Sequence, residues 1–395
     1  MSQHKKIYIE KNSHLKAFAA VLILGVLMFL GTNAQTTHAQ SEFYPPQLTQ
    51  TAVKGMVTEV VKEQLIQNEY AKYTYQELKI KLTQEPYLNQ EIIVKINETP
   101  TSNSTRYEVG DKLNLLRVED ENSKISYYIT DFDRTNAIVL IFFAFIICVL
   151  SVSRFWGLAA VIGMVYSFAI IFKLMLPQIL NGHDPLLIAI LSAFLIAPAS
   201  FYLSHGINRK TTIALISTTI ALIITGILSI IAINMSKLTG FGSEEAYFLQ
   251  LAKHGEINIK GLLLAGIIIG TLGILDDVTV SQASIVTQLK HANKRLSQIE
   301  LYKYAMRVGH DHITSTVNTL VLVYTGAAMP LLLLFINSEK SFTEVMSLEI
   351  IADEIIRTLV GSIGLILAVP ITTFLAVKFA DENDTSAERH CHQVV

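Results

Sequence analysis

Two adjacent aspartates, Asp276 and Asp277, stand in an otherwise apolar stretch of this chain. An ionisable side chain inside a membrane span is costly, and such residues usually line a proton or ion pathway. Two neighbouring carboxylates also resist being ionised together, so one of them is suited to hold a proton. The pair therefore predicts a proton or cation site. The competing interpretation is that both residues only cap a helix break or pair with nearby basic side chains.

Asp277 belongs to a stripe of small and polar residues on one face of the expected helix. Small residues let two membrane helices approach closely, so the glycines are predicted to be helix-packing positions. Asp277 would then point at a neighbouring helix or a hydrated cleft, while Asp276 would point about 100° away. The stripe comprises Gly266, Gly270, Gly273, Asp277, Ser281 and Ser284, at spacings of 4, 3, 4, 4 and 3.

The next apolar run opens with a second polar face. Asp311, Ser315, Asn318 and Thr325 share that face, at spacings of 4, 3 and 7. Asn and Thr side chains at this depth can hydrogen-bond across helices, or they can be no more than polar packing. We predict a transport or proton site between the two helices, near the cytoplasmic side. Its candidate residues are Asp277, Asp276, Ser281, Asp311, Asn318 and Thr319.

Other chemistries lack a supporting motif in the sequence. There is no Walker A loop, HExxH or G-x-S-x-G sequence, so we expect no enzyme and no cofactor. His310 and His312 would point about 200° apart on a helix and could not chelate one metal ion. His390, Cys391 and His392 lie in a short polar tail that we expect to be disordered. No basic face interleaved with aromatic residues predicts nucleic-acid binding.

The composition places the chain in a membrane. Of its 395 residues, 51% are hydrophobic and 16% are charged, whereas soluble domains carry roughly 25% charged residues. We predict a polytopic α-helical membrane protein with a bundle of about seven helices in residues 135–380. Three prolines, Pro198, Pro330 and Pro370, would kink or break these helices. The apolar runs are 137–153, 155–172, 186–205, 212–235, 259–286, 313–336 and 357–378.

The region ahead of the bundle has two parts. Residues 1–40 combine lysines with a short apolar run, which is typical of a signal peptide or an uncleaved signal anchor. Residues 41–134 are more polar and predict a small extracytoplasmic β-domain of the OB or SH3-like kind. No catalytic constellation is evident there. Its expected strands are Val53–Val61, Tyr75–Leu82, Ile92–Ile96, Lys112–Val118 and Ile125–Phe132.

Basic residues in alternate short loops set the expected orientation. They predict a plasma-membrane protein with both termini in the cytoplasm and residues 41–134 outside. The segment 288–310 is rich in Lys and Arg and predicts an inner amphipathic helix attracted to anionic lipid. Residues 381–395 would form a cytoplasmic tail. The expected partner is the lipid bilayer, with a second copy or a second membrane subunit left open.

The aspartate motif and its surroundings resemble one family of proteins. The residues are Gly270-Thr-Leu-Gly-Ile-Leu-Asp-Asp-Val-Thr-Val-Ser-Gln-Ala-Ser, Gly309-His-Asp-His-Ile-Thr-Ser-Thr-Val-Asn-Thr-Leu-Val-Leu-Val-Tyr and Met329-Pro-Leu-Leu-Leu. Together with Val109-Gly-Asp-Lys and Tyr128-Ile-Thr-Asp-Phe-Asp-Arg, they resemble the YibE/F-like bacterial membrane proteins, from about Val53 to Ala376. The resemblance implies a multi-pass plasma-membrane protein and carries over no substrate or catalytic residue.

A looser similarity concerns mechanism. The aspartate pair, the basic segment and the Thr/Ser/Asn-rich helix start are similar in order to the proton-coupled half-bundles of SecD/SecF and RND transporters, although their large extracytoplasmic repeats are missing. We therefore expect a permease or export-related protein coupled to protons. The alternative is a non-transporting scaffold whose outer β-domain recruits an envelope partner.

Overall fold

The computed structural model describes residues 49–67, 72–96, 105–119, 125–336 and 340–380. The expected signal segment 1–40 and the tail 381–395 lie outside these residues. The chain divides into two compact units, with the boundary between Ser151 and Val152. The first carries the strands and the start of the first described helix, and the second carries the remaining helices.

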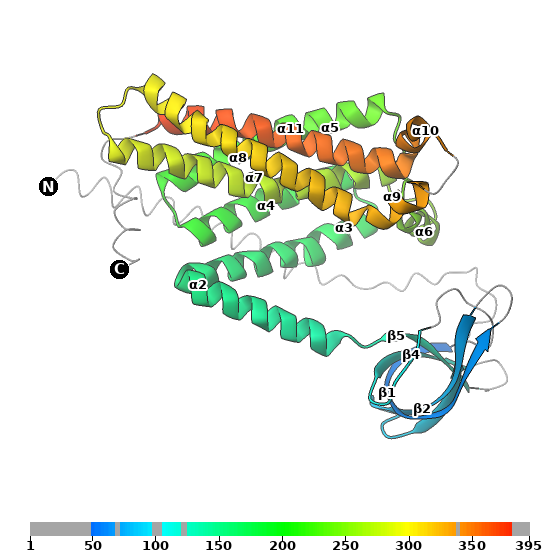
Figure 1. The fold of residues 1–395 in the computed structure, drawn as a ribbon. Coiled ribbons are helices and arrows are strands. Elements are labelled where there is room, and N and C mark those ends of the chain that lie inside the picture. Colours follow the sequence, from blue (N-terminus) through cyan, green and yellow to red (C-terminus); the bar gives the residue numbers. More distant parts are fainter. Residues whose placement is uncertain (1–48, 68–71, 97–104, 120–124, 337–339, 381–395) are drawn as a thin grey trace. The chain divides into compact units, whose positions relative to one another are not determined.

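The five expected strands are confirmed, and they form one antiparallel sheet in the order β3-β2-β1-β4-β5. β1 is long enough to pair with β4 along its first half and with β2 along its second half. Register shifts after Val57 and Val60 bend β1 within its pairing with β2. The outer strands β3 and β5 approach each other, so the sheet curls into a half-barrel (Figure 1). The strands are β1 (Thr49–Gln67), β2 (Lys72–Leu82), β3 (Glu91–Ile96), β4 (Lys112–Glu119) and β5 (Ile125–Phe132).

Alternating apolar residues fill the interior of the half-barrel. One position must be small: a Cβ on Gly55 would lie 2.6 Å from Ile80 Cγ2 and 2.8 Å from Leu115 Cδ1. A glycine in β1 therefore leaves room for side chains of both neighbouring strands, β2 and β4. The buried set is Val53, Val57, Leu78, Ile80, Leu82, Ile92, Val94, Leu113 and Leu115.

Asp133 joins the sheet to the first described helix. Its side chain accepts hydrogen bonds from the hydroxyl and the backbone N–H of Thr135, and Lys54 Nζ of β1 lies 2.9 Å from its Oδ2. The Thr135 hydroxyl and the Lys54 ammonium hold the pKa of the Asp133 carboxyl well below its usual range. Because the folded pKa is depressed, this contact stabilises the junction above the unfolded value of about 3.9 and weakens as the pH falls below it.

Acidification should therefore loosen this junction. We expect the Thr135 amide to exchange faster with solvent as the pH is lowered from 5 towards about 2, after correction for intrinsic exchange. Asp133→Asn should show fast exchange throughout that range, because the amide oxygen cannot replace the carboxylate charge. Hydrogen exchange with mass spectrometry measures both. An unchanged Thr135 exchange rate in Asp133→Asn would contradict the role of this carboxylate.

The helices of the second unit begin where polar side chains cap them. Asn208 Oδ1 accepts from Thr211 N at 2.8 Å, Asn258 Oδ1 accepts from Gly261 N at 2.9 Å, and Ser297 forms a reciprocal capping box with Glu300. The described helices are α2 (Thr135–Ile170), η1 (Ile171–Met175, a π-helical turn), α3 (Leu176–Leu180), α4 (Pro185–His205), α5 (Arg209–Met235), α6 (Glu244–Ala252), α7 (Ile259–Ala292), α8 (Gln298–Ala327), α9 (Met329–Ile336), α10 (Phe342–Ser347) and α11 (Glu349–Lys378).

Within the described ranges, six helical segments are long and apolar enough to cross a membrane. A seventh crossing is reached if α8 and α9, which meet at a bend of 67°, form one broken span. Pro330 is the second residue of α9, next to that break. The six segments are Thr135–Arg154, Trp156–Leu180, Pro185–His205, Arg209–Met235, Ile259–Ala292 and Glu349–Lys378.

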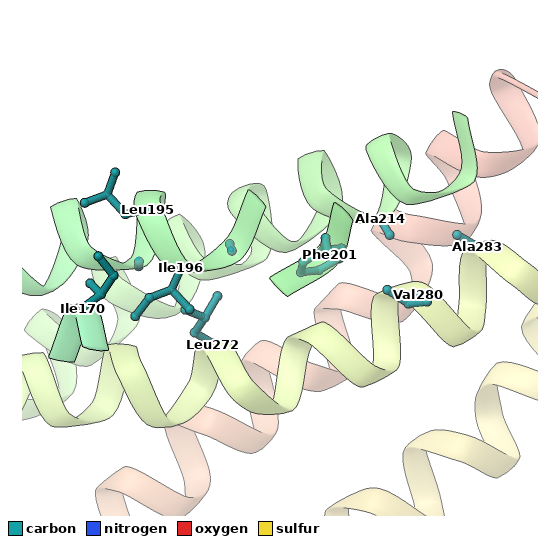
Figure 2. Packing of buried hydrophobic residues seen from close by; sticks show 10 residues of the cluster. Ile170, Leu195, Ile196, Phe201, Ala214, Leu272, Val280 and Ala283 are labelled. Atoms are coloured by element: carbon teal, nitrogen blue, oxygen red, sulfur yellow. The ribbon is translucent and has the colours of Figure 1, made fainter. Parts of the chain in front are cut away.

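Helix α7 is central to the second unit because it packs against α4, α5, α8 and α11. Helices α5 and α11 also pack against each other, so α5, α7 and α11 form a three-helix core (Figure 1). On another side of α7, Ile196 and Phe201 of α4 lie over Leu272 and Val280, as Figure 2 shows. The four neighbours therefore contact α7 on more than one side.

The expected inner amphipathic helix at 288–310 is wrong. Helix α7 continues to Ala292, and α8 already begins at Gln298, so the segment consists of two helix ends and the turn between them. Of the apolar residues of this segment, Leu301 is buried in the bundle and Leu289 and Leu296 pack against the same cluster, whereas Ile299 is 82% exposed. An apolar stripe can face either a membrane surface or a helix bundle, and here the bundle covers most of it.

Candidate functional site

Asp276 is the carboxylate that the fold brings into contact with another helix. It lies near the middle of α7, partly buried, and Ser200 Oγ of α4 donates to its Oδ2 at 2.8 Å. The same end of α4 supplies the buried Ala199 and Phe201. An acidic group in a span is thus held by one neutral donor in an otherwise apolar contact.

A proline lies inside helix α4 close to this contact. Pro198 lies inside α4, two residues before Ser200. Proline lacks an N–H group, so the carbonyl of Phe194 loses its helical donor and the helix is locally easier to bend. Ser200, the donor to Asp276, therefore lies next to the position where α4 lacks a backbone hydrogen bond.

Asp277 does not have the predicted orientation. Its side chain is exposed, and Ser281 on the same face is only partly buried. The spacing identified a real helical face, but α7 presents other faces to its four neighbours. Every side of α7 is largely apolar, so the sequence pattern could not tell which side is inside. Asp276 therefore replaces Asp277 as the interior carboxylate.

The predicted glycine contacts are not made within the described part of one chain. Gly266, Gly270 and Gly273 are exposed, and a Cβ on Gly266 or Gly273 would meet nothing within 4 Å. Close approaches between two helices occur at other glycines, among them Gly309 and Gly364. A Cβ on Gly309 of α8 would lie 2.7 Å from Val369 Cγ1, and one on Gly364 of α11 would collide with Thr225 of α5.

The polar face of α8 points away from α7. Asp311, Ser315, Asn318 and Thr319 are exposed, and Thr319 Oγ1 donates within its own helix to the Ser315 carbonyl at 2.9 Å. Helix α8 instead buries Leu301, Ala305, Gly309 and Leu320. The predicted site centred on Asp277, Asn318 and Thr319 is therefore not assembled by the described residues of one chain.

Buried polar side chains do line the contacts between the core helices. Thr218 Oγ1 of α5 and Thr279 Oγ1 of α7 are 2.7 Å apart, and Gln282 Nε2 donates to Thr373 Oγ1 at 2.7 Å and to the Ala305 carbonyl at 3.1 Å. Most other hydroxyls bond the carbonyl four residues earlier, which is ordinary in membrane helices. This second group is Ser217, Thr225, Ser229, Thr271, Thr358, Thr372 and Thr373.

A second interior carboxylate lies near the start of α11. Asp353 of α11 is 8% exposed, and its Oδ1 has no hydrogen-bond partner within the described part of the chain. One turn earlier, Glu349 Oε1 accepts from the backbone N–H groups of Thr239 and Gly240 at 2.6 and 2.7 Å. These contacts fasten the loop after α5 to the start of α11, and Gly242 of that loop lies against Asp353.

No three His, Cys, Asp or Glu side chains gather closely enough to hold a metal ion in the ranges that the structure describes. His310 is exposed and His312 is partly buried. The His390-Cys391-His392 segment lies outside the described residues.

Sequence reasoning missed Ser200 and Asp353 for different reasons. Ser200 is a single hydroxyl in an apolar helix, and only its proximity to Pro198 sets it apart. Asp353 precedes residue 357, where the expected span begins, so it fell outside every predicted helix. Helix α11 actually begins at Glu349, so Asp353 is helical and buried.

Comparison with known proteins gives the chain a family. No curated protein and no solved structure matches it. The profile of the YibE/F-like protein family matches residues 141–382, which is more than half of the chain and includes every helix from α4 to α11. The half-barrel of β1–β5 lies ahead of the matched region. This helical protein therefore belongs to the YibE/F-like family.

Proposed function

We propose that this protein is a plasma-membrane permease or export protein whose transport step is coupled to protons through Asp276. The observation that carries the proposal is the contact between Asp276 and Ser200, which joins two apolar helices through one ionisable group. Membrane-embedded acids of this kind commonly serve as proton relays. The coupling residue is thus Asp276 in place of Asp277, and a proton on a membrane-embedded aspartate is still the coupling chemistry.

Protonation would change the α4–α7 contact directly. An ionised Asp276 can only accept, and it accepts a hydrogen bond from the Ser200 hydroxyl. A protonated Asp276 is neutral and carries an O–H donor of its own, so its hydrogen bond from Ser200 is weaker. Pro198 lets α4 respond by bending near Ser200. Thr279 lies three residues after Asp276 on α7, and its buried hydroxyl is 2.7 Å from that of Thr218 on α5. Together these groups could relay a local proton change to helix packing.

The basic residues support one orientation for this permease. Arg209 and Lys210 begin α5, while Lys290, Lys294 and Arg295 surround the end of α7. Under the positive-inside rule, this end of the bundle would face the cytoplasm and the half-barrel would lie outside.

Proton flux tests the proposal. Full-length protein in proteoliposomes should take up protons when a membrane potential is imposed, as read by an internal pH dye. Asp276→Asn should abolish the flux, and Ser200→Ala should reduce it. Asp277→Asn is the matched control, because Asp277 is the next residue and is exposed, so the substitution removes the same charge outside the contact. Equal losses in the two aspartate variants would contradict a specific role for Asp276.

A scaffold remains the second candidate because the half-barrel has its own core and exposes large apolar side chains. Ile93 is 63% exposed and Tyr128 is 57% exposed. A recruited envelope partner would cover such residues. If wild-type proteoliposomes match empty liposomes, and removal of residues 49–132 abolishes activity in cells, the scaffold is favoured over the permease.

A further inference from the structure

The outward side of α8 carries an exposed line of residues with a helical repeat. Helix α8 packs against α7 and α11, and its buried side chains, such as Leu301 and Leu320, lie in clusters with residues of those two helices. On the opposite side, exposed residues follow one another at alternating spacings of 4 and 3, which is the heptad repeat of helices that pack side by side. This α8 seam comprises Tyr304, Val308, Asp311, Ser315, Asn318, Leu322 and Thr325.

The middle of the α8 seam is polar, although α8 belongs to a candidate membrane span. Helices α8 and α9 together are long and apolar enough to cross a membrane. Asp311, Ser315 and Asn318 are successive members of the seam, and an exposed carboxylate or amide is costly against hydrocarbon. Within the described ranges, neither the Asp311 carboxylate nor the Asn318 amide has a hydrogen-bond or ion-pair partner. A protein surface therefore suits this seam better than lipid does.

The polar groups of the α8 seam match a second copy of themselves. The Asn318 amide carries both donors and an acceptor, so two copies of it can satisfy each other. Arg307 is exposed beside the seam, one turn before Asp311, and neither residue has an ionic partner in the part of the chain that the structure describes. Between two parallel α8 helices, the guanidinium of one copy can reach the Asp311 carboxylate of the other. A twofold interface requires this kind of self-complementary surface.

We propose that the α8 seam is the interface between two copies of this chain in the membrane. Both copies enter the membrane in the same orientation, so the twofold axis runs along the membrane normal and the two α8 helices pack in parallel. From Tyr304 to Thr325 the seam is about 32 Å long at 1.5 Å per residue, comparable with the hydrocarbon thickness of roughly 30 Å. The small side chain of Ser315 allows a close approach near its middle. The proposal is independent of Asp276 and of proton coupling.

A single cysteine on the α8 seam tests the contact. The background carries Cys148→Ala and Cys391→Ser, and the purified full-length protein is reconstituted in proteoliposomes. Leu322→Cys should give a disulfide-linked dimer on oxidation with copper phenanthroline, because a residue near a twofold axis meets its own copy. Leu322 is 62% exposed, so the change disturbs no buried contact. Ile227→Cys on α5, where the native side chain is 55% exposed, is the matched control and should stay monomeric on a non-reducing gel.

The amide of Asn318 should contribute measurably to the dimer. Asn318→Leu is expected to lower the association constant about tenfold, the effect of losing a hydrogen bond between membrane helices. Energy transfer between donor-labelled and acceptor-labelled protein, followed as the protein-to-lipid ratio is lowered, measures this constant. Val323→Ala, at a 60% exposed position beside the seam, should leave it unchanged. Circular dichroism should be the same for both variants, because both residues are exposed in one chain.

A charge reversal tests the ionic contact between the copies. Asp311→Arg should weaken association, because like charges then meet across the seam. Adding Arg307→Asp should restore the wild-type constant, because the reversed pair is again complementary. An ion pair within one chain would also be restored by this exchange, but the single variant would then leave association unchanged.

The outcomes separate the possible occupants of the α8 seam. A Leu322→Cys dimer, weakened by Asn318→Leu and by Asp311→Arg, supports the interface. A monomer in lipid overturns the proposal: a cysteine that is also unreactive to maleimide means that the same chain covers the seam, and a cross-link to another protein in cell membranes means a different subunit. Equal cross-linking of Leu322→Cys and Ile227→Cys, or a dimer that neither seam variant weakens, overturns it as well.

Discussion

Gly364→Ala is expected to destabilise the helix bundle by about 1–3 kcal/mol, the usual effect of overpacking a tight contact. The added Cβ would collide with the Thr225 hydroxyl and lie 3.2 Å from Thr225 Cβ and Cγ2. Thr225 cannot turn away freely, because its hydroxyl donates to the Ala221 carbonyl at 2.8 Å. Helices α5 and α11 would have to separate. Thermal unfolding of the purified protein in detergent measures the effect.

Gly273→Ala provides the matched control for this prediction. A Cβ at Gly273 of α7 would meet nothing within 4 Å, so the substitution should be neutral, or stabilising by up to about 1 kcal/mol through helix propensity. Adding Thr225→Ala to Gly364→Ala should restore most of the lost stability, because it removes the colliding hydroxyl and methyl groups. Equal melting temperatures for Gly364→Ala and Gly273→Ala would show that α5 and α11 are not packed this closely.

Leu78→Ala is expected to destabilise the half-barrel by about 2–5 kcal/mol, as for other large-to-small changes in a core. Leu78 of β2 is 0% exposed and lies among the buried residues of the sheet. Five strands form a small core, so a cavity there removes much of the total stability. Hydrogen exchange of the full-length protein should show faster exchange throughout β1–β5.

Leu65→Ala is the control on the neighbouring strand. Leu65 of β1 is 58% exposed, so its truncation should change the stability by less than about 0.5 kcal/mol. The helices from α4 to α11 should keep their exchange rates in both variants, because the half-barrel and the bundle are separate compact units. Faster exchange in those helices after Leu78→Ala would show that the two units unfold together.

The sequence was sufficient to locate the elements. The alternation in Lys112–Val118 and Ile125–Phe132 placed β4 and β5 to within a residue, because a strand with one buried face must alternate. Apolar length placed the helices that can cross a membrane, because an unpaired backbone is not tolerated in lipid. Apolar length located the polar ends of the helices less accurately. Helix α11 begins eight residues before the expected 357, since Glu349 and Asp353 are charged yet helical.

Only the tertiary structure decided which side of each helix faces inward. Asp276 and Asp277 are equivalent in the sequence, yet Asp276 accepts a hydrogen bond from Ser200 while Asp277 is exposed. In a soluble helix an apolar stripe marks the inner face, but the membrane helices here are apolar on nearly every side. The inner face of α7 is therefore set by packing against α4, α5, α8 and α11, and packing depends on residues distant in the chain.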